Sequence, residues 1–131
     1  METATTLLNE GCRVSDTIGH SHPYDLIADK NGRLLKIQVK TAKHRDRRKY
    51  DLILQNPDKY TEDNVGLFAA YAVGEDRVFF VPFHEVENGR ASVTFTPLDE
   101  MGSKWNRDNA EHISDYTFEE ALKRISVEDR P

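Results

Sequence analysis

Two runs of alternating polar and apolar residues flank the dipeptide Asn31-Gly32. An Asn-Gly pair between such runs is the strongest short-range sign of a β-hairpin, because a type I′ turn needs two residues that tolerate positive φ. A two-residue turn sets Lys30 opposite Arg33, and the same register carries on to Asp25 opposite Gln38. One face of this hairpin is wholly apolar and holds Tyr24, Leu26, Ala28, Leu35, Ile37 and Val39. The other face is polar and holds Asp25, Asp29, Lys36, Gln38 and Lys40.

The rest of the pattern predicts a helix at each end of the chain and strands between them. Met1 to Glu10 reads as a helix with Ala4, Leu7 and Leu8 on its apolar side, ended by Gly11. Further strands are expected at Arg13 to Ser15, Tyr50 to Leu54, Leu67 to Val73, Val78 to Pro82 and Ala91 to Thr96. A Thr-x-x-Glu capping box at Thr117 predicts a second helix from Phe118 to about Ile125.

These elements predict one α/β domain over residues 1–126, followed by a flexible tail over 127–131. We expect a twisted mixed sheet of about five strands, flanked by the two helices. The length of 131 residues and the 37% hydrophobic content suit a single core. With no apolar run near the length of a membrane span, no signal-peptide pattern and only Cys12, we expect a cytoplasmic protein in a reducing compartment. Cys12 itself fits a small packed residue better than a reactive thiol.

Charge is unevenly distributed along the chain. The net charge of −5 argues mildly against a nucleic-acid partner, since phosphate binding usually leaves a basic footprint. Residues 30–49 nevertheless contain half of the 18 Lys and Arg residues, against a single acid: Lys30, Arg33, Lys36, Lys40, Lys43, Arg45, Arg47, Arg48 and Lys49. This basic strip is either a solvated, flexible loop or a surface that contacts phosphates.

The polar face of the hairpin has two interpretations. Opposed side chains in a strand pair have Cβ atoms about 5 Å apart, so Asp25 and Gln38 could place two oxygens on one ion with the Lys40 ammonium beside them. Such an arrangement is typical of a metal-dependent phosphodiesterase. The alternative is an ordinary two-faced hairpin whose polar side meets water.

An acidic residue on one strand followed by Glu-x-Lys or Gln-x-Lys on the next resembles the core of the PD-(D/E)XK nuclease superfamily. Here these residues are Asp25 and Gln38-Val39-Lys40. The resemblance extends to residues 11–15, to Tyr71 and to Val81-Pro82. It is strongest to the Gln-x-Lys branch, which includes a group I intron homing endonuclease, and reaches more distantly to archaeal Holliday junction resolvases. It implies a restriction-endonuclease-like fold.

The activity implied by this resemblance is hydrolysis of a DNA phosphodiester with Mg²⁺, or with Mn²⁺ as the alternative ion. Asp25, the Gln38 oxygen and the Val39 carbonyl would hold the metal, and Lys40 would orient or help deprotonate the water. Family members commonly add a Glu from the first helix, for which Glu2 is the candidate; a capping or solvent-facing role is its alternative. Gly66 stands where the family often has an acid, so no ligand is expected there.

DNA is therefore the expected partner, and a homodimer is the expected assembly, because one small domain buries little of a duplex. The residues expected to contact DNA are Lys36, Lys43, Arg45, Arg47, Arg48 and Lys49. Two other functions stay open. One is a DNA-binding or assembly module that keeps the fold without strong catalysis, and the other is a Holliday junction resolvase.

Overall fold

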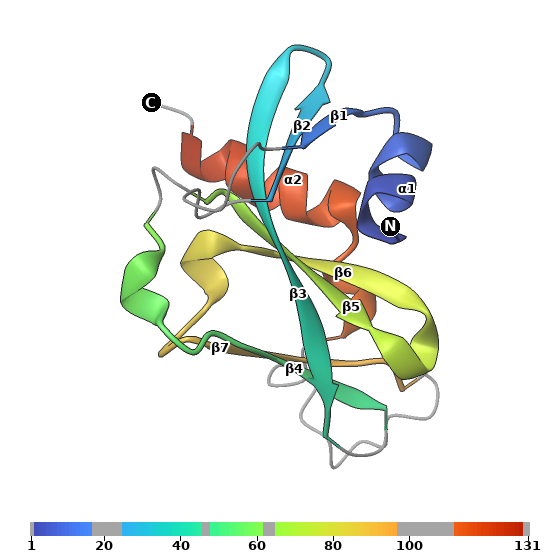
Figure 1. Ribbon diagram of the computed structural model, residues 1–131, viewed down its shortest axis with the longest axis vertical. Helices are drawn as coiled ribbons and strands as arrows, with labels where there is room; N and C mark the ends of the chain where they lie inside the picture. Colours follow the sequence, from blue (N-terminus) through green and yellow to red (C-terminus); the bar gives the residue numbers. More distant parts are fainter. Residues whose placement is uncertain (1, 17–24, 46–47, 62–64, 97–111, 130–131) are drawn as a thin grey trace.

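The long strand β3 (Arg33–His44) runs through the whole molecule, and the other strands are arranged around it (Figure 1). The computed structural model describes residues 2–16, 25–45, 48–61, 65–96 and 112–129. The other strands are β1 (Arg13–Asp16), β2 (Leu26–Lys30), β4 (Lys49–Ile53), β5 (Leu67–Ala72), β6 (Arg77–Pro82) and β7 (Arg90–Thr94). The helices are α1 (Glu2–Asn9) and α2 (Phe118–Asp129).

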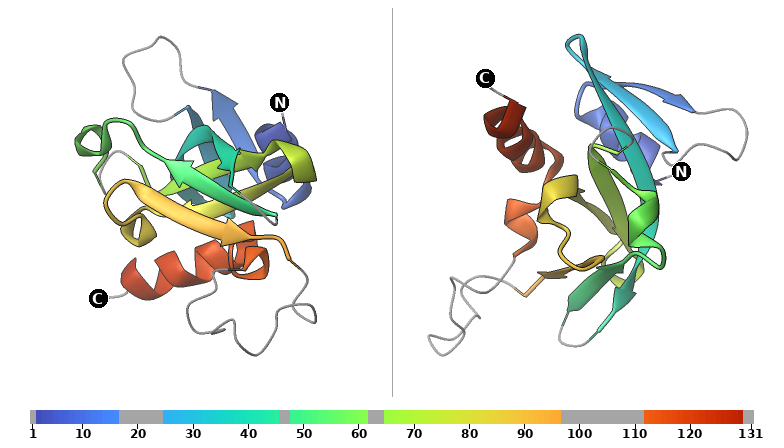
Figure 2. Two further views of the ribbon diagram at one scale, coloured as in Figure 1. Left: turned by 90° about the horizontal axis from the view of Figure 1, so that it is seen from below. Right: turned by 90° about the vertical axis from the view of Figure 1, so that its left-hand side faces the viewer.

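Within the described residues the sheet has seven strands, more than the expected five, because every strand-like run of the sequence pairs with a neighbour. Strands β1, β2 and β3 form an antiparallel meander, and β5 joins the other edge of β3 in parallel. Strand β6 pairs antiparallel with β5, while β4 and β7 lie side by side across the end of β3 (Figure 2, left). The α/β class and the mixed sheet are confirmed. No helix within the described ranges is long and apolar enough to cross a membrane.

The hairpin formed by β2 and β3 has the turn that Asn31-Gly32 predicts. Both residues have positive φ, 54° and 88°. The pairing runs from Lys30 opposite Arg33 to Leu26 opposite Ile37, as the two-residue turn requires. Tyr24, expected on the apolar face, lies outside the described residues.

Alternate residues of β3 point into two separate cores. Leu35 and Ile37 enter a helix-side core, to which both α1 and α2 contribute. Ala42 enters a strand-side core, which β4 and β7 cover. The buried residues of the helix-side core are Leu7, Cys12, Leu26, Ala28, Leu35, Ile37, Leu67, Ala69, Phe80, Phe118 and Ala121. Those of the strand-side core include Ala42, Tyr50, Leu52, Tyr60, Phe68, Ala70, Phe79, Val81, Val93 and Phe95.

Helix α1 ends in a Schellman motif around Gly11, which has φ +83°. The Cys12 N–H donates to the Leu7 carbonyl at 3.1 Å and the Gly11 N–H to the Leu8 carbonyl at 3.1 Å. Leu7 and Cys12 are both buried in the helix-side core, and burial raises the pKa of the Cys12 thiol, so this cysteine packs as expected. Leu8 was expected on the apolar side but is 59% exposed, because Thr3, four residues before Leu7, occupies the buried stripe.

Helix α2 begins at the predicted cap. The Thr117 hydroxyl accepts the Glu120 N–H at 3.2 Å, while the Glu120 carboxylate contacts Lys123 at 3.3 Å. Phe118 and Ala121 are buried, as the apolar pattern predicts. The helix continues to Asp129, four residues beyond its expected end, so residues 127–129 are helical where a loose tail was expected.

Candidate active site

Asp25 lies where β3 changes neighbours. Strand β2 pairs with β3 as far as Ile37, and β4 pairs with it only from Lys43 onward. Between these points β5 is the single described strand that pairs with β3. At this break the Asp25 N–H donates to the Ile37 carbonyl at 2.8 Å, and the Asp25 Oδ2 accepts the Val39 N–H at 2.9 Å. Asp25 is thereby fixed to the segment that carries Gln38 and Lys40.

The expected register needs one correction at this point. Its ladder pairs are confirmed from Lys30 to Leu26, but Asp25 is not itself a ladder partner of Gln38. Its side chain, rather than its backbone, takes the Val39 amide, and its two bonds straddle Gln38. Asp25 therefore lies beside Gln38 through its bonds to the backbone of Ile37 and Val39. The Asp29 side chain is directed toward the hairpin turn, away from Gln38, because its Oδ1 accepts the Gly32 N–H at 2.8 Å.

Gln38 and Lys40 share one face of β3. Gln38 pairs with Phe68 and Lys40 with Ala70 in the parallel ladder, and both partners belong to the strand-side core. Val39 points to the opposite face and packs against the helix-side core. The Gln-x-Lys spacing therefore places two polar side chains about 7 Å apart on one surface, since alternate residues of a strand lie on the same side.

Tyr60 holds the Lys40 ammonium at this surface. The Lys40 Nζ lies 5.7 Å from the centroid of the Tyr60 ring, within the range of a cation–π contact. The ring is buried and meets Phe68 edge to face at 5.4 Å. The sequence analysis missed Tyr60. An aromatic residue shortly after Pro57 in a polar stretch marks a packed loop, but its sequence position does not show which strand the ring will meet.

The donors on this face suit a hard divalent cation that takes some of its ligands from the substrate. Across the described ranges, no group of three or more His, Cys, Asp or Glu residues could hold a metal. One carboxylate from Asp25 and one amide oxygen from Gln38 suit Mg²⁺, which keeps several waters and often takes its other ligands from a substrate phosphate.

The role predicted for Glu2 remains a prediction. The structure describes the backbone of Glu2 in the first turn of α1 but not its side chain. Helix α1 packs on the helix-side core, whereas Gln38 and Lys40 lie on the other face of the sheet. His20 and His22, which precede Asp25 in the sequence, lie outside the described residues.

The structure divides the basic strip between the two faces of β3. Lys36 lies on the same face of β3 as Gln38 and Lys40, two residues before Gln38 and four before Lys40. Lys43 lies on the opposite face, opposite Asp51, and the Arg45 N–H continues this ladder by donating to the Lys49 carbonyl at 2.7 Å.

Asp51 of β4 is the ladder partner of Lys43 and lies on the same face of the sheet. Its buried carboxylate receives bonds from Arg90 at 2.5 Å and Ser92 at 2.6 Å. Burial alone would raise the pKa of Asp51, but these bonds outweigh burial and lower it. Lys43 and Arg45 therefore lie beside a fixed negative charge.

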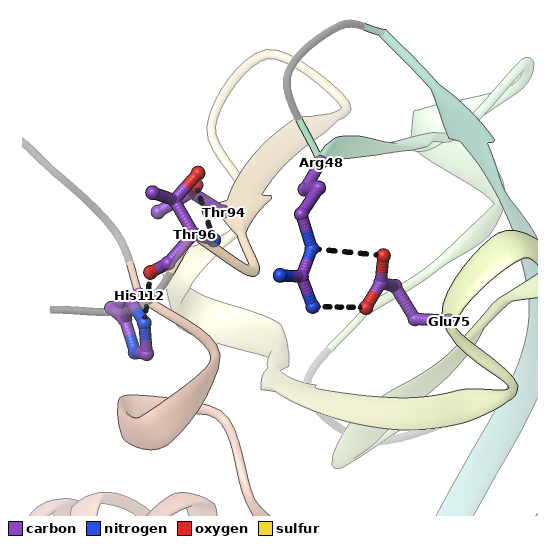
Figure 3. A network of polar contacts seen from close by, with 5 residues as sticks. All are labelled: Arg48, Glu75, Thr94, Thr96 and His112. Atoms are coloured by element: carbon purple, nitrogen blue, oxygen red, sulfur yellow. Dashed lines mark hydrogen bonds and ion pairs between the residues drawn. The ribbon is translucent and has the colours of Figure 1, made fainter. Parts of the chain in front are cut away.

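Arg48 has a structural partner (Figure 3). Its backbone is left-handed, with φ 65°, and its guanidinium binds both carboxylate oxygens of Glu75, at 2.6 and 3.1 Å. These bonds hold the pKa of Glu75 below its usual range. Nearby, the His112 Nε2 donates to the Thr96 carbonyl at 2.7 Å, which ties the chain before α2 to the end of β7. Arg48 therefore fastens the β3–β4 loop to the β5–β6 connection, while Arg47 lies outside the described residues.

Comparisons with known proteins identify the fold and the family of this chain. A search of curated proteins gave no match. The solved structure of a bacterial homing endonuclease, I-Ssp6803I, matches 97% of this chain and 85% of its own, with a TM-score of 0.69 and 20% sequence identity. At that identity the likeness shows the fold. The family model of the PD-(D/E)XK endonucleases matches residues 1–119. The chain therefore belongs to the PD-(D/E)XK endonuclease family.

Proposed function

We propose that this protein is a metal-dependent endodeoxyribonuclease whose site is formed by Asp25, Gln38 and Lys40. The observation that carries the proposal is the bond from the Val39 N–H to the Asp25 carboxylate, at 2.9 Å. It fixes the acid next to the Gln-x-Lys segment at the break in the sheet edge. The family supplies the endonuclease class, and the residues supply the proposed mechanism.

Each side chain has a separate task in this mechanism. Asp25 provides the charge that holds a divalent ion, Mg²⁺ or Mn²⁺, and Gln38 adds a neutral oxygen. When bound, such an ion would supply an activated water and positive charge near the phosphate. The Lys40 ammonium orients that water and offsets the negative charge that develops on the phosphorane, and Tyr60 limits where the ammonium can move.

The proposed assembly on DNA is a homodimer. A domain of 131 residues covers only a short stretch of duplex, and cutting both strands requires two sites. A two-fold axis would place one site on each strand. Sedimentation of the free and the DNA-bound protein tests this, and a strict monomer in both states would contradict it.

Cleavage of supercoiled plasmid and of a four-way junction, with Mg²⁺ and with EDTA, tests the proposed activity. Lys40→Ala should abolish metal-dependent cutting while the fold and most DNA affinity persist. Lys40 is half-buried at the edge of the strand-side core, so its removal should leave the core packed. Glu119→Gln is the matched control, since it removes an exposed carboxylate from α2, which packs on the opposite face of the sheet. Undiminished cutting by Lys40→Ala would remove Lys40 from the mechanism.

A second candidate function is a DNA-binding module with little catalysis. It is favoured by the lack of a three-acid metal group among the residues that the structure describes. The same experiment separates the two, because this module would bind DNA but leave plasmid and junction intact in Mg²⁺ and in Mn²⁺. Cutting confined to the junction would instead indicate a resolvase.

A further inference from the structure

The face of the meander β1–β2–β3 that carries the candidate site continues beyond it toward the hairpin tip. The ladders place Ser15, Ile27 and Lys36 in one row across the three strands. The next row toward the tip consists of Arg13, Asp29 and Leu34. We call these two rows, with Asp25, Gln38 and Lys40, the open hairpin face.

Burial distinguishes this face sharply from its reverse. The reverse side holds Leu26, Ala28, Leu35 and Ile37, which are buried in the helix-side core. On the open hairpin face Arg13, Ser15 and Lys36 are exposed, and Leu34 is 67% exposed. The hairpin extends from the body of the molecule with this face uncovered by either helix (Figure 1). A leucine this exposed between charged neighbours, beside a candidate nuclease site, suggests a contact surface.

The charges on this face are complementary to nucleic acid although the whole chain is acidic, at −5. Arg13, Lys36 and Lys40 contribute three cations. Asp25 belongs to the candidate site, and the carboxylate of Asp29 is bonded to the hairpin turn through the Gly32 N–H. The second basic surface, around Lys43 and Arg45, lies on the opposite face of β3 beside the buried carboxylate of Asp51. The open hairpin face is therefore the cationic surface continuous with the site.

The spacing of the rows matches the spacing of a duplex. Rows two residues apart on one face of a strand are separated by about 7 Å, so Lys36 lies about 7 Å and Arg13 about 14 Å from the row of Asp25. With a rise of about 3.4 Å per base pair, these are steps of about two and four base pairs. Strands of some β-sheet proteins contact bases in the DNA grooves, and in the major groove an apolar side chain can meet a thymine methyl group.

We infer that the open hairpin face docks duplex DNA beside the phosphate to be cut, with Lys36 and Arg13 on flanking phosphates and Leu34 against base edges. This inference rests on the proposed nuclease function and extends it to DNA positioning. Ser15 and Ile27 complete the surface. The catalytic residues alone do not provide tight binding to DNA, so binding near the site also depends on this face.

The salt dependence of binding tests the cations. Each lost phosphate contact lowers the log–log salt slope by about 0.9, so between 50 and 200 mM salt the affinity gap to wild type should change about 3.5-fold per contact. Lys36→Ala and Arg13→Ala should each show this change, and the double variant about 12-fold. Fluorescence anisotropy with a random-sequence duplex in EDTA measures binding without cleavage. Lys123→Ala, which removes an exposed cation from α2, is the matched control and should leave the slope unchanged.

Leu34→Ala tests base contact. It should leave the salt slope unchanged but reduce the difference in affinity between duplexes selected for tight binding and random-sequence duplexes. The inference is overturned if Lys36→Ala and Arg13→Ala behave like Lys123→Ala, or if only Lys43→Ala and Arg45→Ala lower the slope. Plasmid cleavage by the wild type tests the nuclease function separately. A protein that does not cut, but whose salt slope depends on Arg13 and Lys36, would retain this docking face and lose the proposed activity.

Discussion

Asp25→Asn is the substitution that tests the candidate site most directly. The new side chain keeps an oxygen that can accept the Val39 N–H, which now lies 2.9 Å from Oδ2. The change replaces a charge-assisted hydrogen bond with a neutral one and should cost about 1 kcal/mol. A domain of this size typically has about 5–15 kcal/mol of stability, so the variant should fold, with a melting temperature lower by about 3–5 °C.

The effect on activity should be much larger than the effect on stability. Asp25 provides the charged ligand of the proposed metal site, beside a neutral Gln38. Losing it should lower the cleavage rate about 100-fold or more and raise the Mg²⁺ concentration needed for half-maximal rate. Adding Gln38→Glu to Asp25→Asn returns a carboxylate to the site, at the neighbouring position. The double variant should recover part of the metal affinity, with less recovery of turnover because the charge is displaced.

The assay is plasmid cleavage over a Mg²⁺ titration, with Ca²⁺ binding by calorimetry as a measure of metal affinity alone. Glu119→Gln is the control, because it removes an exposed carboxylate from α2, on the opposite face of the sheet. It should keep its rate within about twofold of wild type. Wild-type cleavage by Asp25→Asn, or an equal loss in both variants, would refute the assignment of Asp25.

Three further predictions concern the scaffold and the basic strip. A Cβ on Gly74 would lie 2.3 Å from the Tyr50 hydroxyl, so Gly74→Ala should cost about 1–3 kcal/mol in urea unfolding, and Tyr50→Phe should relieve most of it. Because folding lowers the pKa of Asp51, its carboxylate stabilises the fold at pH values above the unfolded pKa, near 3.9, and this stability is lost as pH falls through the folded pKa. Asp51→Asn should therefore reduce the loss of unfolding free energy with falling pH, as measured by urea unfolding at pH 3–6. Arg48→Ala should lower the melting temperature and leave the DNA salt slope unchanged, because the Arg48 guanidinium binds Glu75.

The hairpin could be predicted because its information is local. Asn31-Gly32 permits one kind of two-residue turn, and that turn sets every later pair as far as Leu26 and Ile37. The wholly apolar runs that became β5 and β6 were similarly clear, since both strands are buried. The end of α2 was less clear, because the residues after Ile125 alternate between charged and apolar without a stop signal.

Features of the site that depend on tertiary contacts could not be predicted. Tyr60 reaches Lys40 from a loop twenty residues further along the chain, and nothing in its local sequence indicates that contact. The sequence does not distinguish Arg48 from its basic neighbours, because its partner Glu75 lies 27 residues further along the chain. The division of the basic strip arises because β3 continues without interruption past the site, so alternation sends Lys36 and Lys43 to opposite faces.

The change of partners along β3 explains why Asp25 has two roles. A strand that leaves one neighbour before it gains the next has backbone amides without a ladder partner, and a buried or half-buried amide without an acceptor costs about 1–3 kcal/mol. The Asp25 carboxylate supplies such an acceptor for Val39, so the residue that holds the sheet edge also carries the charge of the site. Asp25→Ala would remove both roles together and could not separate them. Only the isosteric Asp25→Asn keeps the structural bond while removing the charge, so a difference in activity between these two variants that exceeds their difference in stability would assign the charge a chemical function.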